Sequence, residues 1–84
     1  MMSKTMQDAL NEQMKHEFYS SYLYLSMSAY CDGVNLPGLS RWMRAQAQEE
    51  AKHAMKIFDH VLDRGGRVEL RELGRPDVET RRRQ

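Results

Sequence analysis

Two long amphipathic segments joined by a short link dominate the sequence. Residues 5–31 contain no glycine or proline, and apolar or small side chains recur there at steps of three or four residues. The same spacing recurs over residues 37–64, directly before the pair Gly65-Gly66. Steps of three and four match one face of an α-helix. The sequence therefore predicts two helices, over about residues 5–31 and 37–64.

The ends of both segments carry residues that start or stop helices. Ser3 or Thr5 can cap the first helix, because a hydroxyl oxygen accepts hydrogen bonds from free backbone N–H groups. We expect Gly33 to end that helix in a left-handed conformation. Pro37 suits the first turn of the second helix, where a missing N–H does no harm. A link this short folds two helices into an antiparallel hairpin.

A hairpin alone exposes its whole apolar face, and 84 residues give only a marginal core. We therefore expect an all-α fold in which residues 1–66 form the hairpin and two copies dimerise into a four-helix bundle. Residues 67–84 contain an Arg-rich end and alternate only briefly between apolar and charged side chains. They are expected to form an extended or disordered tail.

The overall composition argues against several partners. The chain has 13 basic and 12 acidic residues, so its net charge of +1 offers no electrostatic attraction to nucleic acid or to a membrane surface. The only cysteine, Cys31, has no intrachain partner, which favours a free thiol in a reducing compartment. The N-terminus has no apolar run typical of a signal peptide. We expect a cytoplasmic protein.

Charged side chains interrupt both apolar stripes near their middle. Glu50 and His53 form a Glu-x-x-His pair, whose members lie on one face of a helix and can reach a single cation. Glu17 interrupts the other stripe and lies about as far before the Gly33 turn as Glu50 lies after it. An unpaired buried carboxylate costs several kcal/mol, so a bound metal ion would explain all three residues. Carboxylate and imidazole ligands suit iron, manganese or zinc.

Each of these residues also has an ordinary structural interpretation. A single glutamate on an imperfect stripe, such as Glu17, is commonly exposed at the edge or paired with a cation. The Glu-x-x-His spacing also occurs on helices by chance. The combination favours a metal site, because the two features lie near the middle of two helices that must be neighbours.

Three stretches of the sequence resemble the first two helices of the bacterial non-haem ferritins. Residues 64–68 also resemble the start of the long crossover loop of that family. The resemblance covers roughly residues 6–70. The helical stretches are Leu10-Asn11-Glu12-Gln13, then Glu17-Phe18-Tyr19-Ser20-Ser21 followed by Tyr24-Leu25, and finally Ala47-x-Glu49-Glu50-x-x-His53-Ala54.

The resemblance implies a role for individual residues. Glu17, Glu50 and His53 match the first iron site of the family, with Glu50 as the bridging carboxylate. Tyr24 matches a tyrosine beside that site, although a core aromatic residue is the alternative. Glu49 matches an outer iron ligand in some bacterial members, although a solvated surface charge is the alternative. Ala51 stands where haem-binding relatives have methionine, so no haem is expected.

Other candidate ligands lie off these positions. His16 and His60 fall outside the row of Glu17 and Glu50 and are expected at the surface. The seven methionines are more plausible as core filler than as ligands.

The resemblance does not extend to the third and fourth helices, which supply the remaining ligands of a ferritin di-iron centre. A four-helix di-iron bundle uses one Glu from each of two helices and one Glu-x-x-His from each of the others. Two copies of this hairpin carry that set. We therefore expect a homodimer that binds iron and oxidises Fe(II) with O₂, for iron storage or detoxification. The alternatives are a structural bundle without turnover and a module that docks on a partner through its basic tail.

Overall fold

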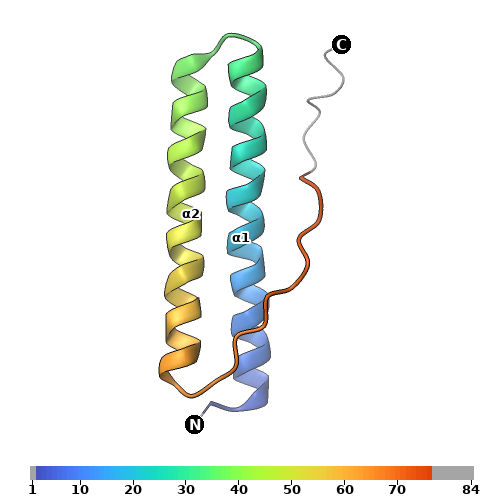
Figure 1. The fold of residues 1–84 in the computed structure, drawn as a ribbon, viewed down its shortest axis with the longest axis vertical. Helices are drawn as coiled ribbons and strands as arrows, with labels where there is room; N and C mark the ends of the chain where they lie inside the picture. Colours follow the sequence, from blue (N-terminus) through green and yellow to red (C-terminus); the bar gives the residue numbers. More distant parts are fainter. Residues whose placement is uncertain (1, 77–84) are drawn as a thin grey trace.

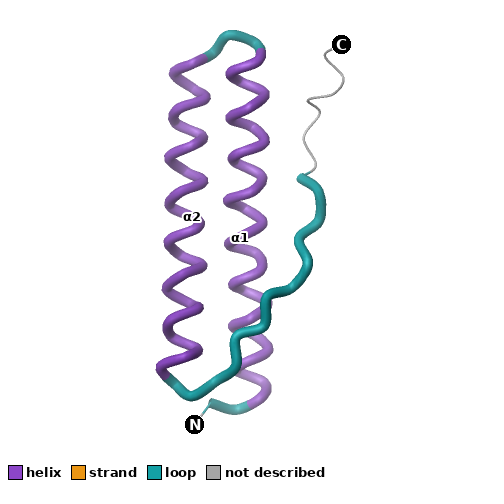
Figure 2. Tube along the Cα trace, viewed as in Figure 1, coloured by secondary structure: helices purple, strands orange, loops and turns teal. Residues whose placement is uncertain are grey.

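The structure, a computed structural model, describes residues 2–76 and consists of two long antiparallel helices (Figure 1). Helix α1 spans Lys4–Gly33 and helix α2 spans Pro37–Asp63. Figure 2 shows the remaining described residues as loop, with no strand among them. The all-α prediction is confirmed, and each observed helix end lies within two residues of its predicted position.

The helix ends follow the predicted chemistry except at the link. Ser3 caps α1, since its side-chain oxygen accepts a hydrogen bond from the N–H of Met6 at 3.1 Å. The prediction that Gly33 adopts a left-handed conformation is wrong, because α1 continues through Gly33. The left-handed residue is Asn35, with φ of 64°. Asparagine tolerates this region better than other residues with a side chain, so the reversal occurs two residues later than expected.

Small and medium-sized side chains line the seam between the helices. Met14 of α1 and Ala47, Ala54 and Val61 of α2 are at most 2% exposed. The three α2 residues recur every seven positions, so they form one row along the helix. Because two of them are alanines, the helix axes approach closely, and little apolar volume is buried in the hairpin itself.

Serine hydrogen bonds hold the two helices in register. The Ser21 hydroxyl donates to the carbonyl oxygen of Ala47 at 2.7 Å. Nearer the link, the buried Ser28 hydroxyl donates to the carbonyl oxygen of Ser40 at 2.8 Å. The Ser40 hydroxyl donates to the carbonyl oxygen of Ser28, also at 2.8 Å. These bonds give the serine hydroxyl groups partners that they would otherwise lack at the seam. The bonds resist sliding of one helix along the other.

The molecule is a slab one helix thick. Its Cα atoms extend over 51 × 21 × 12 Å, and Figure 1 looks down the shortest of these directions. Both broad faces are therefore open, and large apolar side chains such as Trp42 and Leu62 are more than half exposed. Neither helix combines the length and apolar character needed to cross a membrane. A slab of this shape needs a second layer to bury its apolar side chains.

Residues 67–76 run back along α1 as an extended strap (Figures 1 and 2). The side-chain amide of Asn11, only 1% exposed, donates to the carbonyl oxygen of Arg67 and accepts from the N–H of Glu69, both at 2.9 Å. Arg71 forms ion pairs with Glu12 at 2.7 Å and Glu69 at 2.9 Å. The part of the expected tail over residues 77–84 lies outside the described residues.

Candidate metal centre

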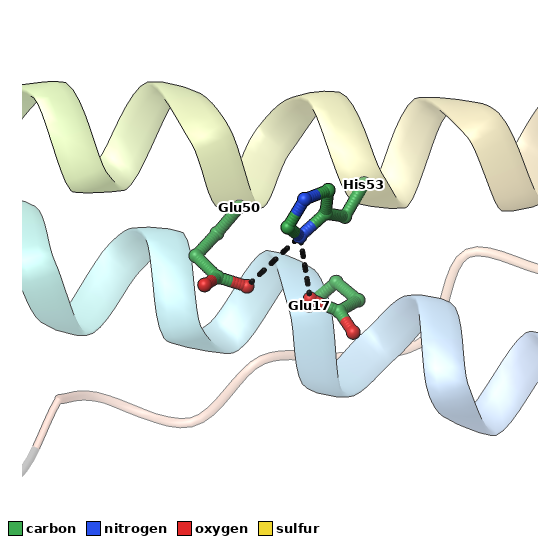
Figure 3. Close-up of side chains that lie close together, drawn as sticks. All are labelled: Glu17, Glu50 and His53. Carbon is green, nitrogen blue, oxygen red and sulfur yellow. Dashed lines mark ion pairs between the residues drawn. The ribbon is translucent and has the colours of Figure 1, made fainter.

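Glu17, Glu50 and His53 converge between the two helices. Figure 3 shows Glu17 on α1 and the other two on α2, with all three side chains directed toward one another. The Nδ1 atom of His53 lies 3.7 Å from Oε1 of Glu17 and 3.7 Å from Oε1 of Glu50. One ligand atom from each residue lies within 4.8 Å of the others. These separations leave room for an ion between them.

The local geometry of each helix explains this convergence. Glu50 and His53 are one turn apart on α2, so their side chains stack along one edge. On α1, Glu17 lies one turn from Ser21, whose hydroxyl donates a hydrogen bond to the carbonyl oxygen of Ala47 on α2. Ala47 in turn lies one turn from Glu50. The inter-helix register that the serines set therefore places the Glu17 carboxylate level with the α2 pair.

The three residues are less covered than a bundle interior requires. The side chains of Glu17 and Glu50 are 20% and 24% exposed, and that of His53 is 49% exposed. The apolar-stripe pattern predicts burial, but in a slab of one layer no other part of residues 2–76 covers this face. A second layer placed here would bury the two carboxylates and remove them from water. Their charge would then require a cation.

The two carboxyl groups shift each other's pKa in opposite directions. A hydrogen bond from Glu50 lowers the pKa of Glu17 below 4.5, and Gln13 adds a second hydrogen bond at 2.7 Å. The same bond to Glu17, followed by burial and the negative charge of Glu17, raises the pKa of Glu50 above 4.5. Two carboxylates this close repel each other, so ionising the second is harder than ionising the first. A divalent ion between them would neutralise both groups.

The donor set defines which ions suit the site. Two carboxylates and one imidazole are ligands of iron, manganese and zinc, whereas soft metals prefer thiolates. Among the described residues, this is the one group of three or more acidic, histidine or cysteine side chains that could hold a metal. Three protein ligands leave coordination positions free, as a catalytic site requires.

Tyr24 lies on the site-bearing side of α1 but away from this group. It follows Glu17 by seven residues, which is about 10.5 Å of helix rise. Its ring packs edge-on against Trp42 of α2, with ring centroids 6.4 Å apart and an interplanar angle of 83°.

The sequence analysis did not name Trp42 or Gln13 as site residues. Gln13 lies four residues before Glu17, and Trp42 lies eight residues before Glu50. This helical spacing from the metal-site residues is the signal that could have identified them.

Other candidate residues lie outside the cluster. The side chain of Glu49 is 55% exposed and forms an ion pair with Lys52 at 3.6 Å. His16 lies 3.3 Å from Glu12 on the same helix, and His60 is exposed. The structure therefore brings together Glu17, Glu50 and His53, but not the outer acidic residue.

Comparison with known proteins agrees with this fold. The model of the ferritin-like domain family matches residues 7–82. The chain belongs to the ferritin family. It is 38% identical over 79 residues to a bacterial non-heme ferritin of Staphylococcus aureus and 39% identical to that of Staphylococcus haemolyticus. These alignments cover 94% of this chain but 48% of each relative, so the chain spans about half their length.

Solved structures give the same result. An open-pore ferritin from the archaeon Archaeoglobus fulgidus superposes with a TM-score of 0.91 and 53% sequence identity. A closed form of that ferritin, engineered by site-directed mutagenesis, superposes with a TM-score of 0.92. Both comparisons cover 94% of this chain and 48% of the other. The predicted family and the ferritin-like helical fold are confirmed.

Proposed function

We propose that two copies of the chain pair about a twofold axis through their site-bearing faces and complete a four-helix bundle. Glu17, Glu50 and His53 of each copy then line one di-iron site. This ligand set, one Glu from each of two helices and one Glu-x-x-His from each of the others, is that of the di-iron four-helix bundles. The observation that carries the proposal is the cluster of three donors within 4.8 Å on an open face of a one-layer slab.

Charge and shape both favour this arrangement. Four ionised carboxylates from two chains neutralise two divalent ions, so the buried site carries no net charge. The paired faces also cover the Tyr24–Trp42 ring pair, which a single hairpin leaves open. A twofold interface uses the same surface on both copies, which explains how one hairpin can provide a complete bundle.

The reaction is the oxidation of Fe(II) by O₂ in the cytoplasm, for iron storage or detoxification. Two Fe(II) ions give up two electrons, and one O₂ takes up these electrons and two protons to form H₂O₂. Glu50 bridges the two ions, while Glu17 and His53 complete the ligand shell of each. Tyr24, on the same face, is a candidate to hydrogen-bond a ligand or donate a further electron.

Anaerobic titration with Fe(II), followed by exposure to O₂, tests this function. We expect two irons per dimer and oxidation much faster than in protein-free buffer. Glu50→Ala and His53→Ala are expected to abolish both. Glu72→Ala and His60→Ala remove an exposed residue of the same type and are expected to change neither. Oxidation no faster than in buffer would refute the ferroxidase proposal.

A further inference from the structure

The carboxylate of Glu17 accepts a hydrogen bond from outside the ligand cluster. Gln13 lies four residues before Glu17 on α1, so the two side chains are neighbours on one face of the helix. The Nε2 atom of Gln13 donates to Oε2 of Glu17 at 2.7 Å. Only the amide N–H group can make this bond, because an ionised carboxylate accepts hydrogen bonds and repels the amide oxygen. Gln13 therefore acts on Glu17 as a donor.

The two carboxylate oxygens of Glu17 face different neighbours. Oε2 accepts from Gln13, whereas Oε1 lies 3.7 Å from Nδ1 of His53, on the side where the three ligands converge (Figure 3). A carboxylate is planar, so a bond that fixes the direction of one oxygen also fixes the direction of the other. The bond from Gln13 thus directs Oε1 toward the ligand cluster.

The other carboxylate of the cluster has no equivalent bond. Gln46 lies four residues before Glu50 on α2, which is the spacing that separates Gln13 from Glu17. Within residues 2–76, no hydrogen bond joins Gln46 to Glu50. The same pair of residue types at the same spacing therefore gives a bond on α1 and none on α2. The bond to Glu17 is a specific feature of this site and not a general result of helical spacing.

A hydrogen bond to Glu17 prepares this side chain for metal binding. A mobile glutamate loses rotamer freedom when it binds an ion, and this loss weakens binding. In the metal-free chain, Gln13 already restricts the Glu17 carboxylate to the orientation in which Oε1 faces His53. Hydrogen bonds of this kind orient the ligands of metal sites, and their removal commonly weakens metal binding about 10- to 100-fold.

The same bond makes the two oxygens of Glu17 unequal as ligands. Oε2 receives the positively polarised N–H group of Gln13, and this group repels a cation that approaches the same oxygen. Oε1 has no such donor from Gln13 and faces the other ligands. An ion between the three side chains therefore meets Oε1 as the better ligand atom.

We propose that Gln13 is a positioning residue that makes Glu17 bind metal through Oε1 alone. Glu50, which Gln46 does not hold, can then offer both of its oxygens, as a carboxylate shared between two ions requires. Gln13 does not contact the ion and acts only through Glu17. This role rests on the metal site proposed above.

Anaerobic Co²⁺ titration of the full chain gives the first test. Gln13→Met removes the amide but keeps an unbranched side chain that favours helix. We expect the Co²⁺ affinity to fall about tenfold. Gln46→Met makes the same change at the same spacing from Glu50, so it is the matched control and should bind Co²⁺ as the wild type does. Circular dichroism should show the same helix content in all three proteins.

Infrared spectroscopy distinguishes positioning from a general loosening of the fold. The asymmetric and symmetric stretches of a carboxylate lie further apart when one oxygen binds a metal ion than when both oxygens bind it. In Co²⁺-saturated Gln13→Met, Oε2 is free to bind, so we expect intensity to move from the widely spaced bands to more closely spaced ones. A loosened fold would lower the affinity and leave the spectrum at saturation unchanged.

Failure of this role can be distinguished from failure of the metal site. If the wild type binds Co²⁺ and Gln13→Met matches it in affinity or in the carboxylate spectrum, the proposed role of Gln13 is overturned and the metal site stands. An equal loss of affinity in Gln46→Met would also overturn it, because the bond to Glu17 would not be the cause. A wild-type chain that binds no Co²⁺ would refute the metal site and the role of Gln13 with it.

Discussion

The imidazole of His53 on α2 lies 3.7 Å from the carboxylate of Glu17 on α1. Residues of two different helices thus share one ligand cluster, and any change in the spacing of the helices changes it. The alanine seam beneath the cluster sets that spacing. We therefore expect the packing of the hairpin and its affinity for metal to be coupled.

Ala54→Leu tests this coupling. Ala54 is fully buried next to the cluster, so a larger side chain must push the helices apart. We expect a loss of about 1–3 kcal/mol in the free energy of unfolding and weaker Co²⁺ binding. Chemical denaturation and Co²⁺ titration measure the two effects. Ala45→Leu, at an exposed position of the same helix, should change neither. Full Co²⁺ affinity in Ala54→Leu would contradict the coupling.

The opposite pKa shifts of Glu17 and Glu50 predict a pH dependence of the stability of the metal-free chain. The pKa of Glu50 is raised, so its proton stabilises the folded state fully below pH 4.5, and this contribution is lost as the pH rises through the raised pKa. The pKa of Glu17 is lowered, so its contribution has the opposite sign. It is present above pH 4.5 and is lost as the pH falls through the lowered pKa.

Below the raised pKa of Glu50, metal binding must release the Glu50 proton. We expect this release alone to weaken affinity about tenfold for each unit of falling pH in that range. Carboxyl ¹³C NMR titration of the metal-free chain measures the responsible pKa directly. In Glu17→Gln the pKa of Glu50 should fall toward 4.5, because the hydrogen bond to the Glu17 carboxylate and its negative charge are removed. The same midpoint in both proteins would show that Glu17 does not raise the pKa of Glu50.

Asn11→Ala is expected to release the strap. The side-chain amide of Asn11 makes two hydrogen bonds to the strap backbone and is almost fully buried. Removing it leaves the carbonyl oxygen of Arg67 and the N–H of Glu69 without partners, so we expect a loss of about 1–3 kcal/mol. Hydrogen exchange at residues 67–71 should rise markedly.

Arg71→Ala serves as the comparison for the strap. It breaks two partly exposed ion pairs, so we expect it to destabilise the fold less than Asn11→Ala does. If Arg71→Ala increases hydrogen exchange of the strap more than Asn11→Ala does, the strap is held by its charges and not by the buried amide.

Substitutions at the link between the helices should have effects that differ from those expected if Gly33 ended α1. Gly33 is helical, and a Cβ added there meets nothing within 4 Å, so Gly33→Ala should stabilise the fold by up to about 1 kcal/mol. Asn35 has a φ of 64°, so Asn35→Ala should destabilise it by about 1 kcal/mol, and Asn35→Gly should be tolerated. Thermal unfolding distinguishes these variants. A destabilised Gly33→Ala would contradict the observed helix end.

The sequence by itself determined the two helices, their antiparallel order and the candidate ligands. These depend on local properties: apolar spacing, the residues that break helices, and the distance of Glu17 and Glu50 from the link. The grouping of Glu50 with His53 could be predicted because residues three or four apart on a helix share a face. The family could be recognised because these residues stand in stretches that resemble it.

Only the tertiary structure decided how the faces are used. It showed that serine hydrogen bonds set the register, that Asn35 rather than Gly33 reverses the chain, and that Asn11 anchors a strap. It also showed that a single hairpin leaves both broad faces open, so Glu17 and Glu50 are only partly covered. These features depend on contacts between residues far apart in the sequence. Helical periodicity indicates that a face is apolar, but only the packed structure shows whether another layer of the same chain covers it.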